Sequence, residues 1–391
     1  MSESALLLSI RGRVQAVGYR PFVYRLAHEL GIAGWVRNSG GQVEIHAEAD
    51  LQSLERFCNR LVADAPPLAR PELHRRDPAL PEGSGVFEVR LSDAGQSSDI
   101  TVPPDYFMCD ECAAELMDPG DRRAGYPFLN CTQCGPRWTV ILDLPYDRES
   151  TTLRSFPLCG DCREEYEDPL DRRFHAEPIA CPRCGPRITF RDLTDQEGVT
   201  GAAALERAVA ALESGLVLAV KGVGGYHLLC DAYNAVAVRR LRRRKQRPAK
   251  PLAVMFPRRG EDQLDAVRED LATVREEREA LVSPERPIVL AARREDSKLP
   301  EEIAPGLIEI GAFLPYSPLH ELLLHRFGRP VVATSGNISG EPVLTDNDEA
   351  AERLGTIADG FLHHDRPIAR PADDSVVRRI AARIKPLRVG R

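Results

Sequence analysis

Long apolar runs are missing from this sequence. No stretch of about 18 or more apolar residues occurs, which excludes a transmembrane helix. The first residues, MSESALLLSIRGR, have a short apolar run with no basic segment before it, unlike a secretory signal peptide. The 43% hydrophobic and 28% charged residues are typical of a globular protein. We therefore expect a cytoplasmic protein with no membrane partner.

Two common nucleotide-binding signatures are also absent, the Walker A motif and a G-x-G-x-x-G turn after a strand. Their absence disfavours the standard nucleotide-binding folds. Acidic residues are missing between Asp231 and Glu261, where ten arginines and lysines fall. Because the net charge of the chain is −7, this local excess indicates a site that faces an anion rather than a protein that coats nucleic acid.

The length of the chain predicts about two to four domains. Residues 1–91 show strand and helix patterns in the order βαββαβ, which is typical of a ferredoxin-like α+β domain. A polar linker follows over residues 92–108, and then a tandem cysteine module over 109–190. Residues 200–391 alternate in the manner of an α/β domain. Here we expect strands at 216–220, 252–256, 288–291, 331–334 and 376–380, and helices at 203–212, 235–245, 262–280 and 318–327.

Eight of the ten cysteines form a repeat with a period of 50 residues. Each unit, 109–134 and 159–184, reads C-x2-C-x18-C-x2-C. Four thiolates form a closed tetrahedral site, so each unit predicts a structural zinc ion rather than a catalytic metal. Pairing within a repeat closes shorter loops than crossed pairing, which stays a second possibility. Cys58 and Cys230 are expected in the core. The predicted ligands are Cys109, Cys112, Cys131 and Cys134, and Cys159, Cys162, Cys181 and Cys184.

A candidate anion site lies between the first strand and the first helix. Its backbone N–H groups and the helix N-terminus are suited to bind an anion, and Arg20 can clamp phosphate oxygens. The candidate phosphate-binding loop comprises Val14, Gln15, Ala16, Val17, Gly18 and Tyr19.

The run from Gly12 to Arg20 closely resembles the acylphosphatase signature G-x-V-Q-G-V-x-[FY]-R. Residues 34–38, Gly-Trp-Val-Arg-Asn, resemble the second motif of that family, G-W-V-x-N. The resemblance covers residues 5–91. It implies that Arg20 binds an acyl phosphate, that Asn38 orients the attacking water, and that the loop amides stabilise the developing charge. Ala16 stands where the family usually has glycine, and its methyl group is tolerated if φ is negative.

Four segments of the third module stand out. K-G-V-G-G-Y-H-L from Lys221 follows an apolar strand and would bring its backbone close to a ligand. K-Q-R-P-A-K-P-L from Lys245 has three cations, enough to hold a triphosphate, although a solvated basic helix end is also possible. T-S-G-N-I-S-G from Thr334 has hydroxyl and amide groups suited to phosphate and carboxylate oxygens, and R-P-A-D-D-S from Arg370 is the last segment.

In this order the four segments strongly resemble the YrdC-like family, whose members make carbamoyl-type adenylates from ATP. The resemblance implies that Lys221 and His227 handle carbamate. It further implies a nucleotide and carbamate site formed by Lys245, Arg247, Lys250, Thr334, Ser335, Asn337, Ser339, Arg370, Asp374 and Ser375.

The fusion of these three modules resembles the N-terminal part of the HypF family of hydrogenase-maturation carbamoyltransferases. That family implies hydrolysis of carbamoyl phosphate to carbamate and phosphate. ATP, with magnesium bridging its phosphates, then converts carbamate to carbamoyl adenylate and pyrophosphate. The carbamoyl group passes to the C-terminal cysteine of a HypE-type acceptor protein, as a precursor of the cyanide ligand of nickel–iron hydrogenase. Because carbamate is unstable in water, we expect it to pass internally.

The family resemblance also implies a further kinase-like (ASKHA) domain, and the sequence stops where that domain would begin. A fragment and a natural short form are both possible, and in a short form transfer to a thiol would need another protein.

Two other functions fit parts of the sequence. An RNA-associated relative of threonylcarbamoyl-adenylate synthases would use the cations of Arg239–Arg247 to bind tRNA, with a steep dependence on salt. The acidic total charge and the acylphosphatase-like module disfavour it, and we expect no nucleic-acid partner. A scaffold with inactive sites would release no phosphate from carbamoyl phosphate.

Overall fold

The computed structural model describes residues 4–90, 104–144, 146–192, 197–338 and 340–390. Backbone contacts divide the chain into two compact units. Unit 1 comprises residues 1–104 and 130–184, and unit 2 comprises residues 105–129 and 185–391. Most of the predicted linker, residues 92–103, lies outside the described ranges.

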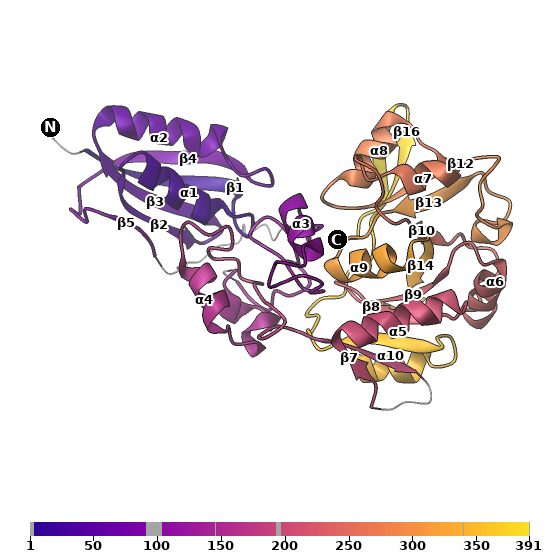
Figure 1. Ribbon diagram of the computed structural model, residues 1–391. Helices are drawn as coiled ribbons and strands as arrows, with labels where there is room; N and C mark the ends of the chain where they lie inside the picture. Colours follow the sequence, from indigo (N-terminus) through magenta and orange to yellow (C-terminus); the bar gives the residue numbers. More distant parts are fainter. Residues whose placement is uncertain (1–3, 91–103, 145, 193–196, 339, 391) are drawn as a thin grey trace. The chain divides into compact units, whose positions relative to one another are not determined.

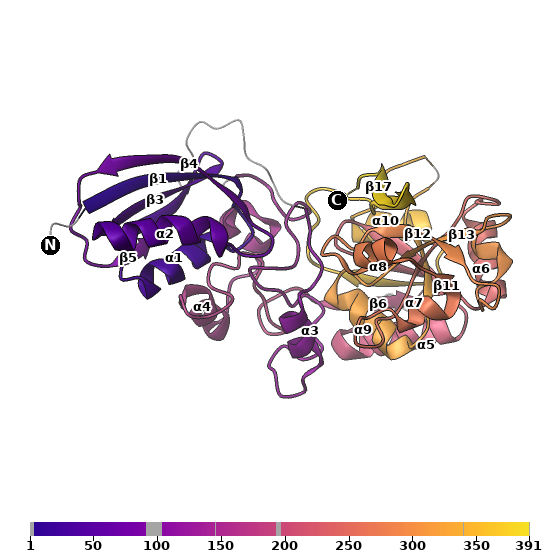
Figure 2. The same cartoon turned by 90° about the horizontal axis from the view of Figure 1, so that it is seen from above.

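A five-stranded sheet with the strand order β4-β1-β3-β2-β5 forms the first part of unit 1 (Figure 1). Helices α1 and α2 contact each other and lie on one face of this sheet (Figure 2). Apolar side chains such as Leu8, Val36, Ile45, Leu54 and Phe57 are fully buried in this layer. The structure confirms the expected ferredoxin-like fold, with one added strand. The elements are β1 (Ser4–Arg13), α1 (Tyr19–Glu29), β2 (Ala33–Ser39), β3 (Gln42–Ala49), α2 (Leu51–Ala63), β4 (Arg70–Ala79) and β5 (Phe87–Val89).

Strand β4, which completes the βαββαβ order, was not predicted, and the added strand is β5, which pairs parallel with β2. Strand β4 pairs antiparallel with β1 at the edge of the sheet, and most of its residues are exposed. It carries Pro71 and Pro78, which an edge strand tolerates because its outer N–H groups need no partner strand. A strand of this kind lacks the apolar alternation from which strands are recognised in a sequence.

The cysteine repeat is also a structural repeat. Helices α3 (Asp110–Met117) and α4 (Gly160–Glu167) each begin directly after the first cysteine of their repeat. In the turn that follows, the N–H of Arg123 donates to Asp121 and the N–H of Arg173 donates to Asp171, both at 2.7 Å. Two short 3-10 helices, η1 (Arg148–Ser150) and η2 (Thr152–Ser155), lie between the repeats in sequence. The duplication inferred from the sequence therefore extends to the backbone.

Unit 2 is built on one large mixed sheet with the order β17-β16-β12-β13-β10-β14-β9-β8-β15-β6-β7, and β11 pairs with β12. The expected α/β class is confirmed. The strands are β6 (Ile188–Asp192), β7 (Val199–Thr200), β8 (Leu218–Lys221), β9 (Tyr226–Asp231), β10 (Ala253–Met255), β11 (Leu271–Ala272), β12 (Ile288–Arg293), β13 (Glu309–Phe313), β14 (Val331–Ser335), β15 (Gly360–His364), β16 (Val376–Ile380) and β17 (Arg383–Arg388). The helices are α5 (Gly201–Glu213), α6 (Ala235–Arg244), α7 (Asp265–Asp270), α8 (Arg275–Val282), α9 (Pro318–Phe327) and α10 (Asn347–Leu354), with the 3-10 turn η3 (Glu301–Ile303).

The single helix predicted over residues 262–280 is wrong. Two short helices, α7 and α8, occur there, separated by β11. The reason is Asp270, whose buried carboxylate accepts hydrogen bonds from the N–H of Lys298 (2.8 Å), from Ser297 Oγ (2.9 Å) and from Tyr233 Oη (2.7 Å). These tertiary bonds turn the chain out of the helix and into the pairing with β12.

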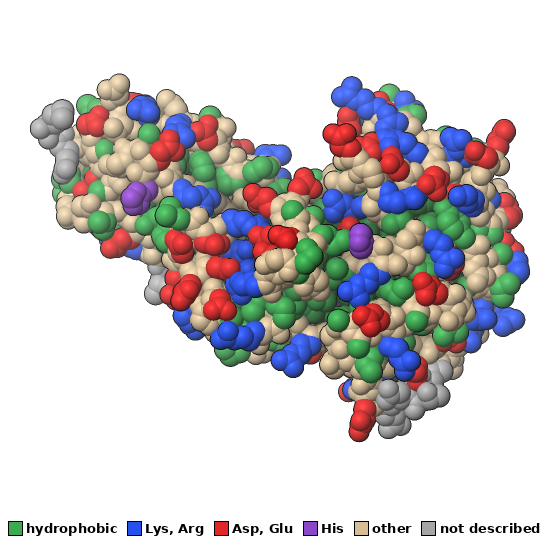
Figure 3. Space-filling model, viewed as in Figure 1, with side chains coloured by type: hydrophobic (Ala, Val, Ile, Leu, Met, Phe, Trp, Pro, Cys, Tyr) green, Lys and Arg blue, Asp and Glu red, His purple; other side chains and the backbone are tan. Residues whose placement is uncertain are grey.

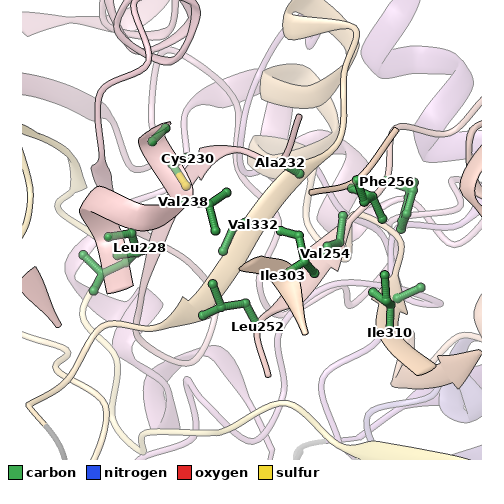
Figure 4. Close-up of a cluster of buried hydrophobic side chains, with 14 of the residues drawn as sticks. Leu228, Cys230, Ala232, Val238, Leu252, Val254, Phe256, Ile303, Ile310 and Val332 are labelled. Atoms are coloured by element: carbon green, nitrogen blue, oxygen red, sulfur yellow. The ribbon is translucent and has the colours of Figure 1, made fainter. Parts of the chain in front are cut away.

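The core of unit 2 lies between the sheet and its helices. Figure 4 shows side chains of β9, β10 and β14 meeting Val238 of α6 and Ile303 of η3. Cys230 belongs to this cluster and is fully buried, while Cys58 is buried in α2, as predicted for both. Burial raises the pKa of each thiol. Neither cysteine is therefore suited to nucleophilic chemistry.

The basic segment after Asp231 is largely neutralised within unit 2. Arg242 is buried and donates to the carbonyls of Ile303 and Arg247, while Arg239 pairs with Glu302 and Arg244 with Asp359. The expectation that this whole segment faces an anion is therefore wrong for α6. On the face of the molecule in Figure 3, basic and acidic side chains are intermixed. Within the described residues, no helix is both long and apolar enough to span a bilayer.

Candidate functional site

The anion loop joins β1 to α1, and Gly18 caps the helix with φ 73°. Arg20 follows in the first turn of α1 and is 9% exposed. Asn38, from β2, is 1% exposed. With the amide oxygen of Asn38 facing Arg20, it accepts from Nε at 3.1 Å and from Nη2 at 3.2 Å. The structure thus brings together the two residues expected to be catalytic.

The loop offers backbone groups rather than side chains. Val14 and Val17 are buried, and Tyr19 donates its hydroxyl to the carbonyl of Leu61 at 2.9 Å, inside the core. Gln15 is also buried and donates weakly to the carbonyl of Gln42 at 3.4 Å. The side chains of these loop residues hold the loop in place, which leaves the backbone N–H groups for an anion.

Ala16 departs from the expectation of a negative φ, because its φ is 57°. The left-handed conformation costs a residue with a Cβ atom about 1–2 kcal/mol, which explains why glycine is usual at this position. The strained turn is supported from the cysteine module. Nε of Arg137 donates to the carbonyl of Ala16 at 2.7 Å. Arg137 is 1% exposed and also donates to the carbonyls of Thr132, Cys134 and Pro136.

The cysteine module also brings two carboxylates to Arg20. Nη2 of Arg20 lies 3.1 Å from Asp147 Oδ1 and 3.6 Å from Glu177 Oε1. Together with His175 and Tyr146, Glu177 lines a small cavity that Arg20 and Ala16 complete. Burial raises the pKa of Glu177 to about 7, an effect that Arg20 opposes, and burial lowers the pKa of His175 to about 4. None of these four finger residues was predicted from the sequence.

A larger cavity of about 570 Å³ opens beside this one and is also lined by Arg20 and Asp147. Four further arginines line it together with the carboxylates of Asp147, Glu149 and Glu167, so positive charge is in excess, which suits the entry of an anionic substrate. The four arginines are Arg90, Arg148, Arg154 and Arg163.

The eight predicted zinc ligands form two groups, one per repeat, as sequential pairing requires. Within each group the ligand atoms all lie within 4.8 Å of one another. The Sγ–Sγ distance is 3.8 Å for Cys131 and Cys134, and 3.7 Å for Cys181 with both Cys159 and Cys184. A tetrahedral zinc ion with Zn–S bonds of about 2.3 Å has ligand edges of nearly this length. Both groups therefore fit a structural zinc ion.

In unit 2, the motifs that begin at Lys245 and Thr334 come together. Nζ of Lys245 donates to Ser335 O (2.6 Å), Asn337 O (2.8 Å) and Asn337 Oδ1 (3.0 Å). Nη1 of Arg247 donates to Thr334 Oγ1 at 3.2 Å. Because the three donors of Lys245 are all used, the structure assigns it to shaping the loop rather than to binding a phosphate directly. Lys250 is exposed, and Ser339 lies outside the described residues.

His227 is the centre of a second arrangement in this unit. In the ladder between β9 and β14 it stands opposite Ser335. Its Nε2 lies 3.0 Å from Asp374 Oδ2, and the hydroxyl of Tyr316 lies 3.1 Å from its Nδ1. Ser375, which follows Asp374 in the chain, accepts a hydrogen bond from the N–H of Gly390 at 3.0 Å. Arg370 precedes β16 and is partly exposed. The structure therefore places His227 beside the Thr334 loop and the segment that follows Arg370.

Lys221 lies apart from His227. In the β8–β9 hairpin Lys221 stands opposite Tyr226, so its side chain points to the other face of the sheet from that of the next residue, His227. Its Nζ donates to Asn347 Oδ1 (2.8 Å) and to the carbonyl of His364 (3.2 Å), at the wall of a cavity of about 490 Å³. Burial, with help from the nearby Arg366, lowers the pKa of Lys221 to about 8.

One of the glycines between Lys221 and His227 is required by packing. A Cβ atom on Gly224 would lie 2.5 Å from the carbonyl oxygen of Ala372, so glycine is needed for the close approach of two protein segments. Packing alone therefore explains the glycine at 224, and the approach of this loop to a ligand stays a prediction.

Three family models match parts of the chain. The acylphosphatase model matches residues 7–75, and the model described as HypF finger matches residues 108–141 and 158–191. The Sua5, YciO and YrdC model, described as telomere recombination, matches residues 210–390. The three modules expected from the sequence are thus present in the expected order.

A carbamoyltransferase HypF from Synechocystis sp. is 48% identical to the chain over 380 residues, which are 97% of this chain. The chain belongs to the HypF family. It spans about half the length of the curated relatives that it matches, since it covers 48% of the Synechocystis HypF.

Two further comparisons support this placement. A crystal structure of full-length HypF in a phosphate- and nucleotide-bound form matches with a TM-score of 0.93 and 38% identity, over 100% of this chain and 50% of that chain. Within the HypF architecture the first module is itself similar to free acylphosphatases. The acylphosphatase of Thermotoga maritima is 41% identical over 87 residues, which are 22% of this chain and 96% of that enzyme.

The sequence contained only a coarse signal for the finger residues near Arg20. In the 50-residue register, His175 corresponds to Gly125 and Glu177 corresponds to Pro127. All seven positions between the shared Asp-Arg-Arg turn and the shared second cysteine pair differ between the two copies. Divergence between the copies therefore marks the stretch 174–180 as a whole, and it does not single out His175 and Glu177 within it.

Proposed function

We propose that the chain hydrolyses carbamoyl phosphate to carbamate and phosphate, and then activates carbamate with ATP to form carbamoyl adenylate and pyrophosphate. The proposal rests on one observation: Arg20 lies beside both Asn38 and the anion loop, in a chain of the HypF family. The similar full-length HypF was solved with phosphate and nucleotide bound, which supports both halves of the reaction.

In the first step, Arg20 binds the phosphoryl group of carbamoyl phosphate. The Asp147 carboxylate now lies against this guanidinium, so the substrate takes its place. The buried amide of Asn38 holds Arg20 and orients the attacking water. The N–H groups of the loop stabilise the charge that develops on the phosphoryl oxygens, and they are already in place because the loop is held by Arg137.

In the second step, ATP lies beside the loop that follows Thr334. Lys245 holds the shape of this loop, and Arg247 together with Lys250 supplies positive charge for the phosphates. Magnesium would accompany ATP in the same proposal and would neutralise charge on its phosphates. His227, fixed between Tyr316 and Asp374, orients the carbamate. Lys221, on the other face of the sheet, lines a cavity of its own.

The fate of the carbamoyl group follows from the family. We propose that it passes to a thiol of a HypE-type acceptor protein during hydrogenase maturation. A cytoplasmic location fits, because the eight zinc ligands must stay reduced.

The test is exchange of labelled pyrophosphate into ATP. The full chain should catalyse this exchange when carbamoyl phosphate is present. Arg20→Ala should abolish it, and addition of carbamate, as an ammonium bicarbonate mixture, should restore it. Arg56→Ala, which changes an exposed arginine of α2, is the matched control and should behave as the wild type. Exchange that requires threonine and bicarbonate in place of carbamoyl phosphate would contradict the proposal.

A further inference from the structure

The Glu177 carboxyl group is buried beside Arg20 with one oxygen unused. Its side chain is 1% exposed. Oε2 accepts from the N–H of Arg148 at 2.9 Å and from the hydroxyl of Tyr166 at 2.8 Å. Oε1 has no hydrogen-bond partner among the described residues, and it lies 3.6 Å from Nη2 of Arg20. A buried acceptor of this kind is costly unless a ligand satisfies it.

The orientation of this carboxyl group is fixed. Because two donors hold Oε2, Oε1 can point only into the small cavity that Arg20, Ala16 and His175 also line. Arg20, which would hold the phosphoryl group, lines the same small space. The unused acceptor therefore faces the space next to a phosphoryl group bound to Arg20.

Two of the differences between the repeats lie at this cavity. His175 adopts a φ of 52°, close to the 65° of Gly125 in the first repeat, although a left-handed backbone is strained for histidine. Glu177 replaces the Pro127 of the first repeat. A structural zinc finger needs neither change, since the first repeat gathers its four thiolates without them.

The chemistry of the acyl group identifies what Oε1 would accept. A carbamoyl group carries an NH₂ with two hydrogen-bond donors, whereas an acetyl group has a methyl in the same place. We propose that Glu177, supplied by the second zinc-finger repeat, is a specificity-determining residue that accepts a hydrogen bond from the carbamoyl NH₂ of the substrate held by Arg20. This inference rests on the proposed function, because it names the group recognised at the same site.

The energetic consequence is a higher affinity for a carbamoyl phosphate than for an acetyl phosphate. An acetyl group would leave Oε1 buried and unsatisfied, which corresponds to an affinity lower by about 10- to 100-fold. The free acylphosphatase of Thermotoga maritima corresponds to the first module alone, since 96% of that enzyme matches 22% of this chain. The selectivity is therefore expected to belong to the zinc-finger module and not to the acylphosphatase module.

The variant that tests this is Glu177→Gln. Its amide oxygen would stay with the two donors, Arg148 N–H and Tyr166 Oη, so its NH₂ would take the position of Oε1. The change thus replaces an acceptor by a donor at nearly constant shape. Glu164→Gln, on the exposed side of α4 in the same repeat, is the matched control.

The measurement is the affinity of the whole 391-residue chain for carbamoylphosphonate and acetylphosphonate, two stable analogues, by calorimetry at pH 8. The wild type and Glu164→Gln should bind the carbamoyl analogue about 10- to 100-fold more tightly than the acetyl analogue. Glu177→Gln should lose that preference while its affinity for acetylphosphonate changes by less than about threefold. Zinc content checks that each variant is folded.

Two outcomes would overturn the inference. One is an equal affinity of the wild type for both analogues, a result that can be interpreted without any variant. The other is a parallel loss of both affinities in Glu177→Gln, which would show that Glu177 only positions Arg20. Phosphate release from carbamoyl phosphate, followed in parallel, reports on the proposed function separately. Its absence would refute hydrolysis, while the ratio of the two affinities would still decide the role of Glu177.

Discussion

At the scale of single residues, burial controls the chemistry of the two site lysines in unit 2. The chain has only five lysines, and Lys221 and Lys245 are both buried. Burial lowers the pKa of each to about 8, and neighbouring cations contribute, Arg366 for Lys221 and Arg247 for Lys245. Desolvation disfavours the ammonium form, so each amine loses its proton at a lower pH than an ordinary lysine.

This predicts an unusual reactivity of Lys221 toward acylating reagents. Only the neutral amine reacts, so labelling should rise as the pH increases and reach half of its maximum near pH 8. An ordinary lysine is half neutral only at about pH 10.4. Trace acetic anhydride between pH 7 and 11, with peptide mass spectrometry, measures this, and the exposed Lys385 serves as the internal reference. A profile for Lys221 that coincides with that of Lys385 would show that the cavity does not desolvate the amine.

At the scale of elements, the first zinc-finger repeat supports the strained anion loop. Arg137 joins them, since it donates to the carbonyl of Ala16 and to three carbonyls around Cys134. Its counterpart in the second repeat, Arg187, is exposed. The same tripeptide, Gly-Pro-Arg, therefore has a structural role in one copy that it lacks in the other.

Arg137→Gln should destabilise unit 1 by about 2–4 kcal/mol, because it leaves several buried carbonyls without donors. Arg187→Gln should change the stability by less than about 0.5 kcal/mol, as is usual for a surface position. Urea unfolding followed by tryptophan fluorescence measures the effect on unit 1, since both tryptophans of the chain, Trp35 and Trp138, belong to it. Equal midpoint shifts in the two variants would contradict the assigned role of Arg137.

At the scale of the whole molecule, the distribution of charge argues against nucleic-acid binding. The net charge is −7, and four of the five arginines of α6, all but the exposed Arg243, are paired with carboxylates and carbonyls of unit 2. Binding to phosphate backbones needs cations that are free to release counterions.

The chain should therefore bind tRNA no more tightly than about 10⁻⁴ M at physiological salt, as for weak non-specific association. Fluorescence anisotropy of labelled tRNA between 50 and 200 mM KCl tests this. Micromolar binding with a steep salt dependence would instead favour the RNA-associated function.

The sequence supported some expectations better than others. The zinc groups and the anion loop were predictable because their residues lie within about 25 positions of one another, so spacing alone constrains their geometry. Strand β4 and the break between α7 and α8 were not predictable, because an edge strand lacks apolar alternation and Asp270 acts through partners distant in sequence. Lys221 and His227 share one motif, yet the pleat of β9 and β8 sends them to opposite faces.

By itself, the sequence determined the order of the modules, the eight metal-binding cysteines and the pairing of an arginine with an anion loop, since each is encoded by local spacing and by turn chemistry. The structure decided that the cysteines group within each repeat. Only the tertiary structure decided what surrounds Arg20. Asp147 is 127 residues away from it in sequence, and Glu177 is further still. No local pattern can specify these contacts, because they depend on how the finger module packs against the first helix. Packing is a property of complete surfaces rather than of motifs.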